Sequence, residues 1–427
     1  MKYLFILIYL LFFSILSAQI SNRFVSATTN GLVLEGAAYR FIGANLWQAV
    51  PWAASGEAGR ARLCRELDRL QAIGVNNLRI MAMAEGPASA PWRFNPTMSE
   101  APDSINPTWL SGLDYVLVEL SKREMKAVLC LSNFWPWSGG FAQYLVWADG
   151  SEIPYPPPAQ NGSWSKFETY SANFYKNKKA NRYFKNHVQL LLGRVNAINN
   201  LPYVEDPTIM AWQLANEPRY GKNFKAFYSW VRKTTQFLEK RAPKQLLSLG
   251  IEGIRISKQD KFYRHYKYLH QIRQVDYLTL HLWPENWGWY RSDTMDSIPG
   301  IQIKNYIQQH LNIAKAVHKP IVLEEFGLAR DRRDFSDSTS TSKRDVFYQL
   351  LMEWMLEAQK DNSEWSGLNF WAWSGEGRPS PNLGYWQLGD PFTGDPPHEP
   401  QGWYSVYDSD SSTLQIISKF STKLKKQ

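Results

Sequence analysis

Two glutamates each follow a short apolar run of the kind that forms a buried strand. Glu217 ends the run in residues 209–217 and Glu325 ends the run in residues 321–325, and both runs are bounded by proline or glycine. Such short, bounded runs favour strands over helices. Parallel strands bring their carboxyl ends to one edge of a sheet, so we expect the two acids to face each other. Hydrolysis of a glycosidic bond requires such a pair of carboxyl groups.

Glu217 is the expected acid/base, the group that gives a proton to the leaving oxygen. It follows Asn216 and an apolar strand, and these surroundings are expected to raise its pKa. A pKa near 6 to 7, roughly the range that suits a general acid at neutral pH, is the expectation for this carboxyl group.

Glu325 is the expected nucleophile. Arg79 lies in an otherwise apolar strand, and a buried arginine is costly unless a carboxylate pairs with it. Arg79 and His281, which ends another strand, are therefore expected to hold Glu325 ionised. A neutral His281 would hydrogen-bond the nucleophile or a sugar hydroxyl. Glu324 competes for the nucleophile's role, but its opposite strand parity predicts that it faces away from the barrel axis.

Aromatic side chains supply the other half of a sugar site, because the apolar face of a pyranose ring stacks on a flat indole. The chain has 19 tryptophans, and many of them fall at or just beyond the ends of expected strands. These are Trp47, Trp135, Trp137, Trp283, Trp287, Trp289, Trp371 and Trp373. Their position predicts a sugar-binding face at the carboxyl edge of the sheet.

Other chemistries lack a starting motif. The 7 histidines contain no His-x-x-x-His pair and the 2 cysteines are far apart in the sequence, so we expect no metal site. There is no phosphate-binding glycine loop and no nucleophile elbow of a serine esterase. We therefore expect no cofactor.

The apolar patterns alternate between strands and helices along the whole chain, which is typical of parallel strands with helices outside. We expect strands at 40–45, 77–81, 126–132, 209–217, 245–249, 276–281, 321–325 and 366–373. We expect helices at 58–72, 107–122, 166–197, 224–240, 301–317, 343–358 and 413–424. These patterns predict an α/β fold, a (β/α)8 TIM barrel, with an N-terminal β-hairpin turning at Asn30-Gly31 and long active-face loops such as 384–412.

The N-terminus resembles a secretory signal peptide. Lys2 precedes an apolar stretch, and small residues follow it, with a cleavage site expected after Ala18. Residues 1–18 are thus the expected signal peptide and 19–427 a single catalytic barrel domain, secreted to the extracellular space or periplasm. No later stretch approaches the roughly 20 apolar residues that span a bilayer, so no membrane anchor is expected. The two cysteines, Cys64 and Cys130, are expected to be buried free thiols.

The chain is basic, with a formal net charge of +9. Its basic residues are mostly scattered through helices, a pattern that serves solubility more often than polyanion binding. We therefore expect no nucleic-acid partner, and we expect a monomer.

The motifs carry a family resemblance. Ala215-Asn216-Glu217-Pro218 and Glu324-Glu325-Phe326-Gly327 resemble the acid/base and nucleophile motifs of glycoside hydrolase family five, clan A, whose members are retaining barrel enzymes. Arg79, His281 and Trp371 match the family's arginine, histidine and platform indole. Within the family, the segments around Trp47, Asn133, Trp135, Trp283 and 401–410 resemble endo-β-1,4-mannanases. Many members carry an aromatic hydroxyl where this chain has Trp283, a departure that affects how the nucleophile is oriented.

The resemblance implies a secreted, retaining endo-β-1,4-mannanase whose substrate is a β-mannan polysaccharide or oligosaccharide. Its implied substrate-binding residues are Arg79, Asn133, Asn216, His281, Trp47, Trp135, Trp283, Trp371 and Trp373. A β-1,4-glucanase and an exo-acting β-mannosidase on the same barrel are the alternatives within this class. A noncatalytic sugar-binding protein is the alternative outside it, although such a protein needs the indoles but not the two glutamates.

Overall fold

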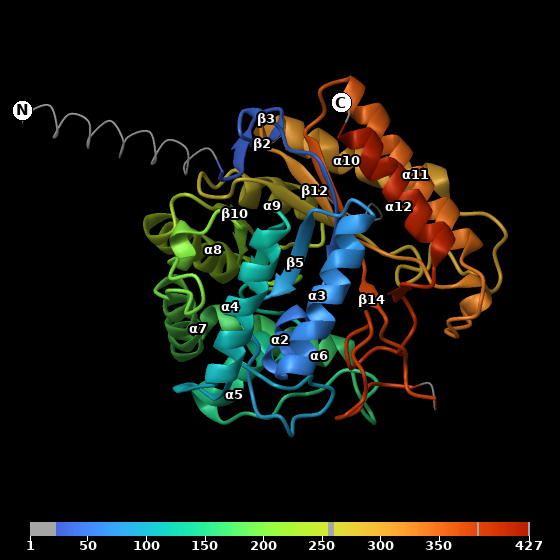
Figure 1. Cartoon of the computed structure of the whole chain (residues 1–427). Coiled ribbons are helices and arrows are strands. Elements are labelled where there is room, and N and C mark those ends of the chain that lie inside the picture. Colours follow the sequence, from blue (N-terminus) through green and yellow to red (C-terminus); the bar gives the residue numbers. More distant parts are fainter. Residues whose placement is uncertain (1–22, 255–259, 382–383, 426–427) are drawn as a thin grey trace, which may run out of the picture.

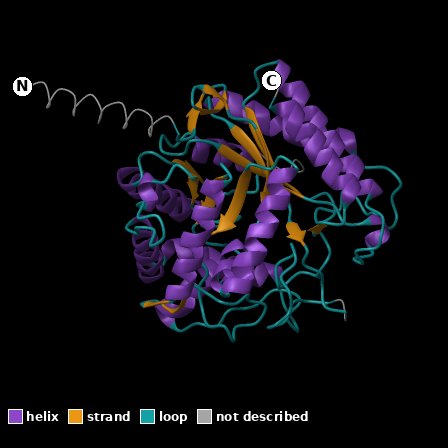
Figure 2. Ribbon diagram, viewed as in Figure 1, coloured by secondary structure: helices purple, strands orange, loops and turns teal. Residues whose placement is uncertain are grey.

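A sheet of eight parallel strands lies at the centre of the molecule, with helices packed around it (Figures 1 and 2). The computed structural model describes residues 23–254, 260–381 and 384–425, so the expected signal peptide lies outside the described residues. The strands of this sheet are β4 (Phe41–Asn45), β5 (Asn77–Met81), β8 (Lys126–Cys130), β9 (Ile209–Gln213), β10 (Leu246–Ser248), β11 (Leu278–Leu282), β12 (Ile321–Phe326) and β13 (Trp365–Phe370).

The sheet curls into a barrel. Its order is β10-β9-β8-β5-β4-β13-β12-β11, so the first and last strands in the sequence, β4 and β13, are paired neighbours. Between β10 and β11 the backbone N–H of Asp276 donates to the carbonyl of Leu247 at 2.8 Å. The expected (β/α)8 barrel is thus confirmed, and all carboxyl ends of its strands meet at one face.

Helices follow the strands and cover the outside of the barrel. They are α2 (Ala49–Ala54), α3 (Glu57–Ala72), α4 (Pro107–Lys122), α5 (Gly140–Asp149), α6 (Trp164–Ser171), α7 (Lys178–Leu192), α8 (Phe224–Arg241), α9 (Asp260–His270), α10 (Gly300–Val317), α11 (Ser342–Lys360) and α12 (Ser411–Leu424). Short 3₁₀ helices are η1 (Pro136–Ser138), η2 (Ala172–Lys176), η3 (Tyr203–Glu205) and η4 (Asp331–Arg333). The sequence patterns did not predict α2, α5 and α9. α5 begins at the second of two adjacent glycines, a pair that is typical of loops.

The N-terminal hairpin covers the barrel end opposite the strands' carboxyl ends. β1 (Ser26–Thr28) pairs antiparallel with β2 (Gly31–Leu34), which in turn pairs with β3 (Ala37–Ala38). Leu32 of the hairpin is buried in one apolar cluster with Val128, Met210 and Val322 of the barrel strands. Burial of these side chains closes the barrel floor and leaves the opposite face for the site.

Long loops build up the carboxyl face of the barrel. One small pair of strands, β6 (Ser99–Ala101) and β7 (Ser104–Ile105), lies in the loop after β5. A second pair, β14 (Trp373–Gly375) and β15 (Val406–Tyr407), ties together the two ends of the segment 376–405. This segment coincides with most of the expected active-face loop and forms one wall of the site.

The two cysteines are free thiols, as expected; Cys130 is buried and Cys64 is half-buried. Burial raises the pKa of the Cys130 thiol to about 12, so this group stays protonated. None of the helices in the described part of the chain is both long and apolar enough to cross a membrane.

Candidate active site

The two glutamates reach the carboxyl face by different backbone routes. Glu325 belongs to β12, whereas Glu217 lies four residues beyond the end of β9. Glu217 has a φ of 48°, in the left-handed region that few residues other than glycine adopt. Its N–H donates to the carbonyl of Gly250 at 2.9 Å, a bond that holds the turn in place. Both side chains are buried at the base of a cavity.

Arg79 pairs with Glu325, as the sequence predicted. Its Nη1 atom donates to Glu325 Oε1 and also lies 3.1 Å from Asn45 Oδ1. Nη2 donates to Asn216 Oδ1 at 2.7 Å, and Nε donates to Gln213 Oε1 at 2.8 Å. The planar guanidinium therefore fixes both the expected nucleophile and the asparagine beside the expected acid/base.

Glu324 does not face away from the barrel axis, so this prediction is wrong. Its carboxylate accepts two hydrogen bonds of 2.8 Å from Gln213 Nε2, inside the barrel, and lies 3.5 Å from Arg79 Nε. The pairing register of β12 shifts here: Leu280 faces Leu323, but His281 faces Glu325. The extra residue breaks the alternation of sides, so adjacent glutamates both point inward.

His281 lies between the two expected catalytic carboxylates. Its Nδ1 atom is 2.6 Å from Glu217 Oε1 and 3.2 Å from Glu325 Oε2, and its Nε2 atom is 3.8 Å from Glu324 Oε2. Burial alone would lower the pKa of His281, but the charge of Glu325 and the bonds to these carboxylates raise it well above its usual value. This direction favours the imidazolium form of His281 over the neutral imidazole that the sequence suggested.

The pKa of Glu217 is shifted in the direction opposite to the one expected from the sequence. Burial acts to raise it, but the hydrogen bond and the charge of His281 outweigh burial, so the pKa lies below its usual value. The prediction of a raised pKa is wrong because the sequence could not reveal a cation 2.6 Å away. Trp135 adds a third donor, since its Nε1 atom donates to Glu217 Oε2 at 2.7 Å.

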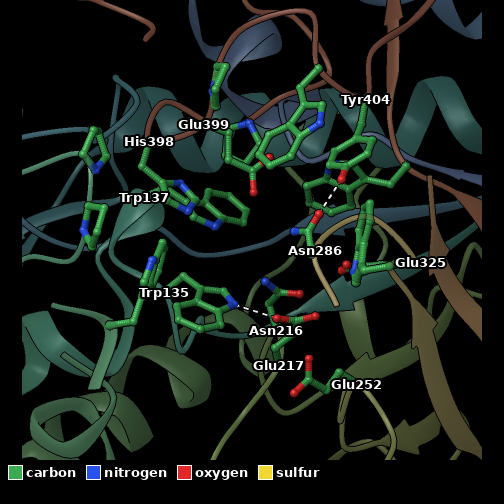
Figure 3. Close-up of a pocket in the computed structure, with 18 of the residues that line it drawn as sticks. Trp135, Trp137, Asn216, Glu217, Glu252, Asn286, Glu325, His398, Glu399 and Tyr404 are labelled. Carbon is green, nitrogen blue, oxygen red and sulfur yellow. Dashed lines mark hydrogen bonds between the residues drawn. The ribbon is translucent and has the colours of Figure 1, made fainter. Parts of the chain in front are cut away.

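A cavity of about 570 Å³ opens above these carboxylates (Figure 3). Trp135, Trp283 and Trp371 contribute indole surfaces to it, and the rings of Trp283 and Trp371 stand nearly perpendicular, at 80°. The segment 384–404 forms its opposite side. The other lining residues are Trp137, Pro157, Pro158, Trp164, Glu168, Asn216, Arg219, Glu252, Asn286, Trp287, Tyr385, Pro396, His398, Glu399, Pro400, Trp403 and Tyr404.

A model of the "GH family 5 beta-mannosidase-like" family matches residues 22–427. The chain belongs to this family. A glycoside hydrolase family 5 mannosidase from Rhizomucor miehei has a similar crystal structure, with 37% identity and a TM-score of 0.86, and the match covers 95% of this chain and 98% of that one. A variant of that mannosidase has been solved with mannosyl-fructose.

Curated relatives are similar along most of the chain. Mannan endo-1,4-beta-mannosidase 4 of Solanum lycopersicum is 26% identical over 382 residues, which cover 86% of this chain and 87% of the relative. An endo-1,4-beta-mannanase from Rhizomucor miehei, 19% identical with a TM-score of 0.68 over 95% of this chain and 100% of its own, shares the fold. The chain is thus a glycoside hydrolase of family 5, and the resemblance seen in its motifs is confirmed.

Five of the residues expected to bind substrate in this family 5 enzyme do not line the cavity: Arg79 and His281, which lie beneath the two carboxylates, and Trp47, Trp373 and Asn133. Trp47 is buried edge-on against Trp137, and its indole N–H donates to the carbonyl of Gly394 at 2.8 Å. Trp373 is buried behind the strands, where its N–H donates to Glu66 at 3.0 Å. Asn133 is buried too, and its Oδ1 accepts from Asn216 and from the N–H of Trp135. These side chains support the wall and do not form it.

Several other residues that line the cavity were not predicted from the sequence. Glu399 and His398 come from the segment between β14 and β15, in which no strand or helix pattern marks a position. Burial and the negative charges of Asp395, Glu325 and Glu217 raise the pKa of Glu399 well above its usual value. Arg219 lies only two residues after Glu217, and this proximity was a signal that the sequence did offer.

Glu217, His281 and Glu325 also place one ligand atom each within 4.8 Å of one another, a spacing that could hold a metal ion. The same spacing follows from the hydrogen bonds between them. Arg79 and His281 already supply positive charge to these carboxylates, so the group is accounted for by ion pairing.

Proposed function

We propose that this family 5 enzyme hydrolyses β-1,4-mannosidic bonds with retention of configuration, with Glu325 as nucleophile and Glu217 as acid/base. The observation that carries the proposal is the closeness of the two carboxylates, which offer oxygens within 4.8 Å of each other beside His281. Retaining glycosidases hold their carboxyl groups about 5–5.5 Å apart, whereas inverting enzymes leave about 6.5–9.5 Å for a water.

The mechanism has two steps. In the first, Glu325 attacks the anomeric carbon and forms a glycosyl ester, while Glu217 gives its proton to the oxygen of the bond that breaks. In the second, Glu217 takes a proton from water, whose oxygen displaces Glu325 from the anomeric carbon. Arg79 holds Glu325 in place for attack through the Nη1 contact.

Discrimination between mannose and glucose requires polar groups beside the 2-hydroxyl, which is axial in mannose. Asn216 lines the cavity and accepts a hydrogen bond from Arg79 at 2.7 Å, and these two contacts support it as the residue that binds this hydroxyl. Arg79 and His281 are buried and act on the sugar only through the groups they hold. The names of the relatives support mannan over cellulose as the substrate.

The relatives named as endo-acting enzymes support cleavage within mannan chains. Exo-action at chain ends is the second candidate, because residues of the segment 384–404 contact the opposite side of the cavity. His398 and Glu399 lie across from the catalytic carboxylates in Figure 3, and the ring of His398 is 6.2 Å from that of Trp164 on α6. This contact brings together two of the segments that line the cavity, whereas an endo-acting enzyme needs an open cleft.

One experiment tests the substrate and the mode together. Purified protein is incubated with linear mannan, soluble cellulose and xylan, and the products are sized over time. We expect fast cleavage of mannan alone, since a mismatched epimer leaves buried polar groups unpaired and costs roughly 10⁴-fold in kcat/KM. Short oligosaccharides as first products support endo-action, and mannose alone supports exo-action. Comparable rates on cellulose contradict the mannoside assignment.

We also propose that residues 19–427 form a single secreted catalytic domain and act as a monomer, without a membrane anchor or a nucleic-acid partner. The family match, which begins at residue 22, supports this boundary. N-terminal sequencing of exported protein, with light scattering for its mass, tests both parts: a mature N-terminus far from residue 19 contradicts the boundary.

A further inference from the structure

Arg219 is clamped by carboxylates from two separate elements. Its Nη1 atom donates to Glu168 of α6 at 2.8 Å, and its Nη2 atom donates to Glu252, in the loop after β10, at 2.9 Å. Two opposed partners fix the plane of a guanidinium more firmly than one, because the fork can no longer rotate. Arg219 follows Glu217 by only two residues, so this clamp also fixes the backbone beside the acid/base.

The fixed guanidinium lies on the indole of Trp135. The Cζ atom of Arg219 is 4.7 Å from the centre of the ring, a cation–π distance. Phe167 of α6 packs nearly parallel to the same indole, at 17° and 6.1 Å between centroids. Held in this way, the ring directs its Nε1 atom to Glu217 Oε2 at 2.7 Å.

The two oxygens of Glu217 therefore have separate partners. Oε1 is bound to His281, which is itself held by Glu325, whereas Oε2 is bound to Trp135. Trp135 lines the cavity and His281 does not, so Oε2 is the oxygen on the substrate side. The oxygen that delivers the proton is thus the one whose place depends on the indole.

We infer that Arg219 is a positioning residue for acid/base catalysis: by holding the Trp135 indole, it sets where Glu217 Oε2 meets the glycosidic oxygen. The inference rests on the proposed function, because it requires Glu217 to be the acid. Arg219 touches neither the expected nucleophile nor its arginine partner, so attack by Glu325 proceeds without it. Loss of Arg219 must then harm only substrates whose leaving group needs a proton.

A set of aryl β-mannosides tests this. Dinitrophenolate leaves without being protonated, 4-nitrophenolate needs little protonation by the acid, and phenolate needs much. None of the three substrates has a second sugar that could bind at an aglycone site. General acid catalysis contributes about 10²–10⁴-fold to the rate. Because Glu217 is displaced in the variant but still present, only part of this contribution is lost, and we expect kcat/KM on the phenyl substrate to fall roughly tenfold. For Arg219→Ala we expect that loss with phenol and an almost unchanged rate with dinitrophenol, which also shows that the variant is folded.

Matched variants separate the outcomes. Arg232→Ala removes an exposed arginine that lies 6.0 Å from the ring of Tyr228, away from the cavity, and should change no rate. Trp135→Phe removes the indole N–H and should give the same leaving-group dependence as Arg219→Ala. If Arg219 acts through Trp135, the double variant should lose little more than either single one. Fully additive losses would overturn the inference.

Two further results decide between this role and others. Removing Arg219 takes away a positive charge and displaces the Trp135 N–H, both of which favour ionised Glu217, so the alkaline limb of the kcat/KM profile should move to higher pH. An equal loss of kcat/KM on all three aryl mannosides, with no shift of the alkaline limb of the pH profile, overturns the inference and indicates a structural role. Glu217→Gln is measured in parallel on the same three substrates. If its loss of kcat/KM does not depend on the leaving group, the proposed acid/base itself is wrong. If the loss depends on the leaving group for Glu217→Gln but not for Arg219→Ala, only the role of Arg219 is refuted.

Discussion

Replacing Glu324 with glutamine tests the ion pairing beneath the two proposed catalytic carboxylates. Glu324 lies 3.5 Å from Arg79 Nε and 3.8 Å from His281 Nε2. At an effective dielectric constant near 20 these attractions are worth about 5 and 4 kcal/mol, and the desolvation of a buried carboxylate, several kcal/mol, offsets much of that. Removal of one partner from a buried pair typically costs 3–5 kcal/mol. We expect Glu324→Gln to lower the free energy of unfolding by about 3 kcal/mol at pH 7.

The pKa of Glu324 determines how the stability difference between wild type and Glu324→Gln changes with pH. Burial acts to raise the pKa of Glu324, but Arg79, His281 and Gln213 together bring it below its usual value. A carboxyl group with a lowered folded-state pKa stabilises the protein above its unfolded pKa, near 4.3, and loses that contribution as pH falls through the folded-state pKa. The gap between wild type and Glu324→Gln should therefore narrow on acidification.

Urea unfolding of both proteins between pH 7 and pH 3, followed by tryptophan fluorescence, measures this gap. Glu325→Gln is the matched control, with the same chemical change one residue along the chain. Glu325→Gln should abolish turnover, because it removes the proposed nucleophile. Glu324 does not line the cavity, so Glu324→Gln should keep measurable turnover. Equal stability of Glu324→Gln and wild type at pH 7, or a gap that widens in acid, would refute the reasoning.

Three further predictions concern catalysis. Glu325→Ala should lose turnover and regain part of it with azide, giving a glycosyl azide of inverted configuration by NMR; a retained product would assign this position to the acid/base. Because the pKa of Glu217 is lowered, kcat/KM should fall at a pH below the roughly 6 to 7 of a tuned general acid, and a plateau to pH 7 would contradict this. Treatment with EDTA should leave kcat unchanged, since Arg79 and His281 supply the positive charge at the carboxylates; a loss restored by a divalent ion would show that a metal takes part.

The barrel and its two glutamates could be predicted because they follow from local sequence patterns. Short, continuous apolar runs that end in acid identify β9 and β12, and a buried arginine implies a carboxylate partner, which Arg79 has. These inferences need only burial and the parallel arrangement of strands. The environment of each of these residues can be inferred from its neighbours within a few positions of the sequence.

The errors come from interactions that no local pattern contains. Trp47 and Trp371 both stand at strand ends, but Trp47 is covered because its N–H meets Gly394, almost 350 positions later, at 2.8 Å. Glu324 points inward because of a register shift that alternation cannot reveal. Glu399 reaches the cavity from a segment without regular structure, where composition gives no direction.

His281 lies beside both of the groups whose charge changes during the proposed reaction. Before the first step, with Glu217 protonated, Arg79 and His281 balance Glu324 and Glu325. When Glu325 becomes an ester it loses its negative charge, and Glu217 gains one as its proton leaves. His281 Nδ1 lies 3.2 Å from one of these carboxylates and 2.6 Å from the other, so the charge moves between two partners of the same cation. Arg79 and His281 thus have two carboxylate partners in each state, which keeps the cost of charge movement low.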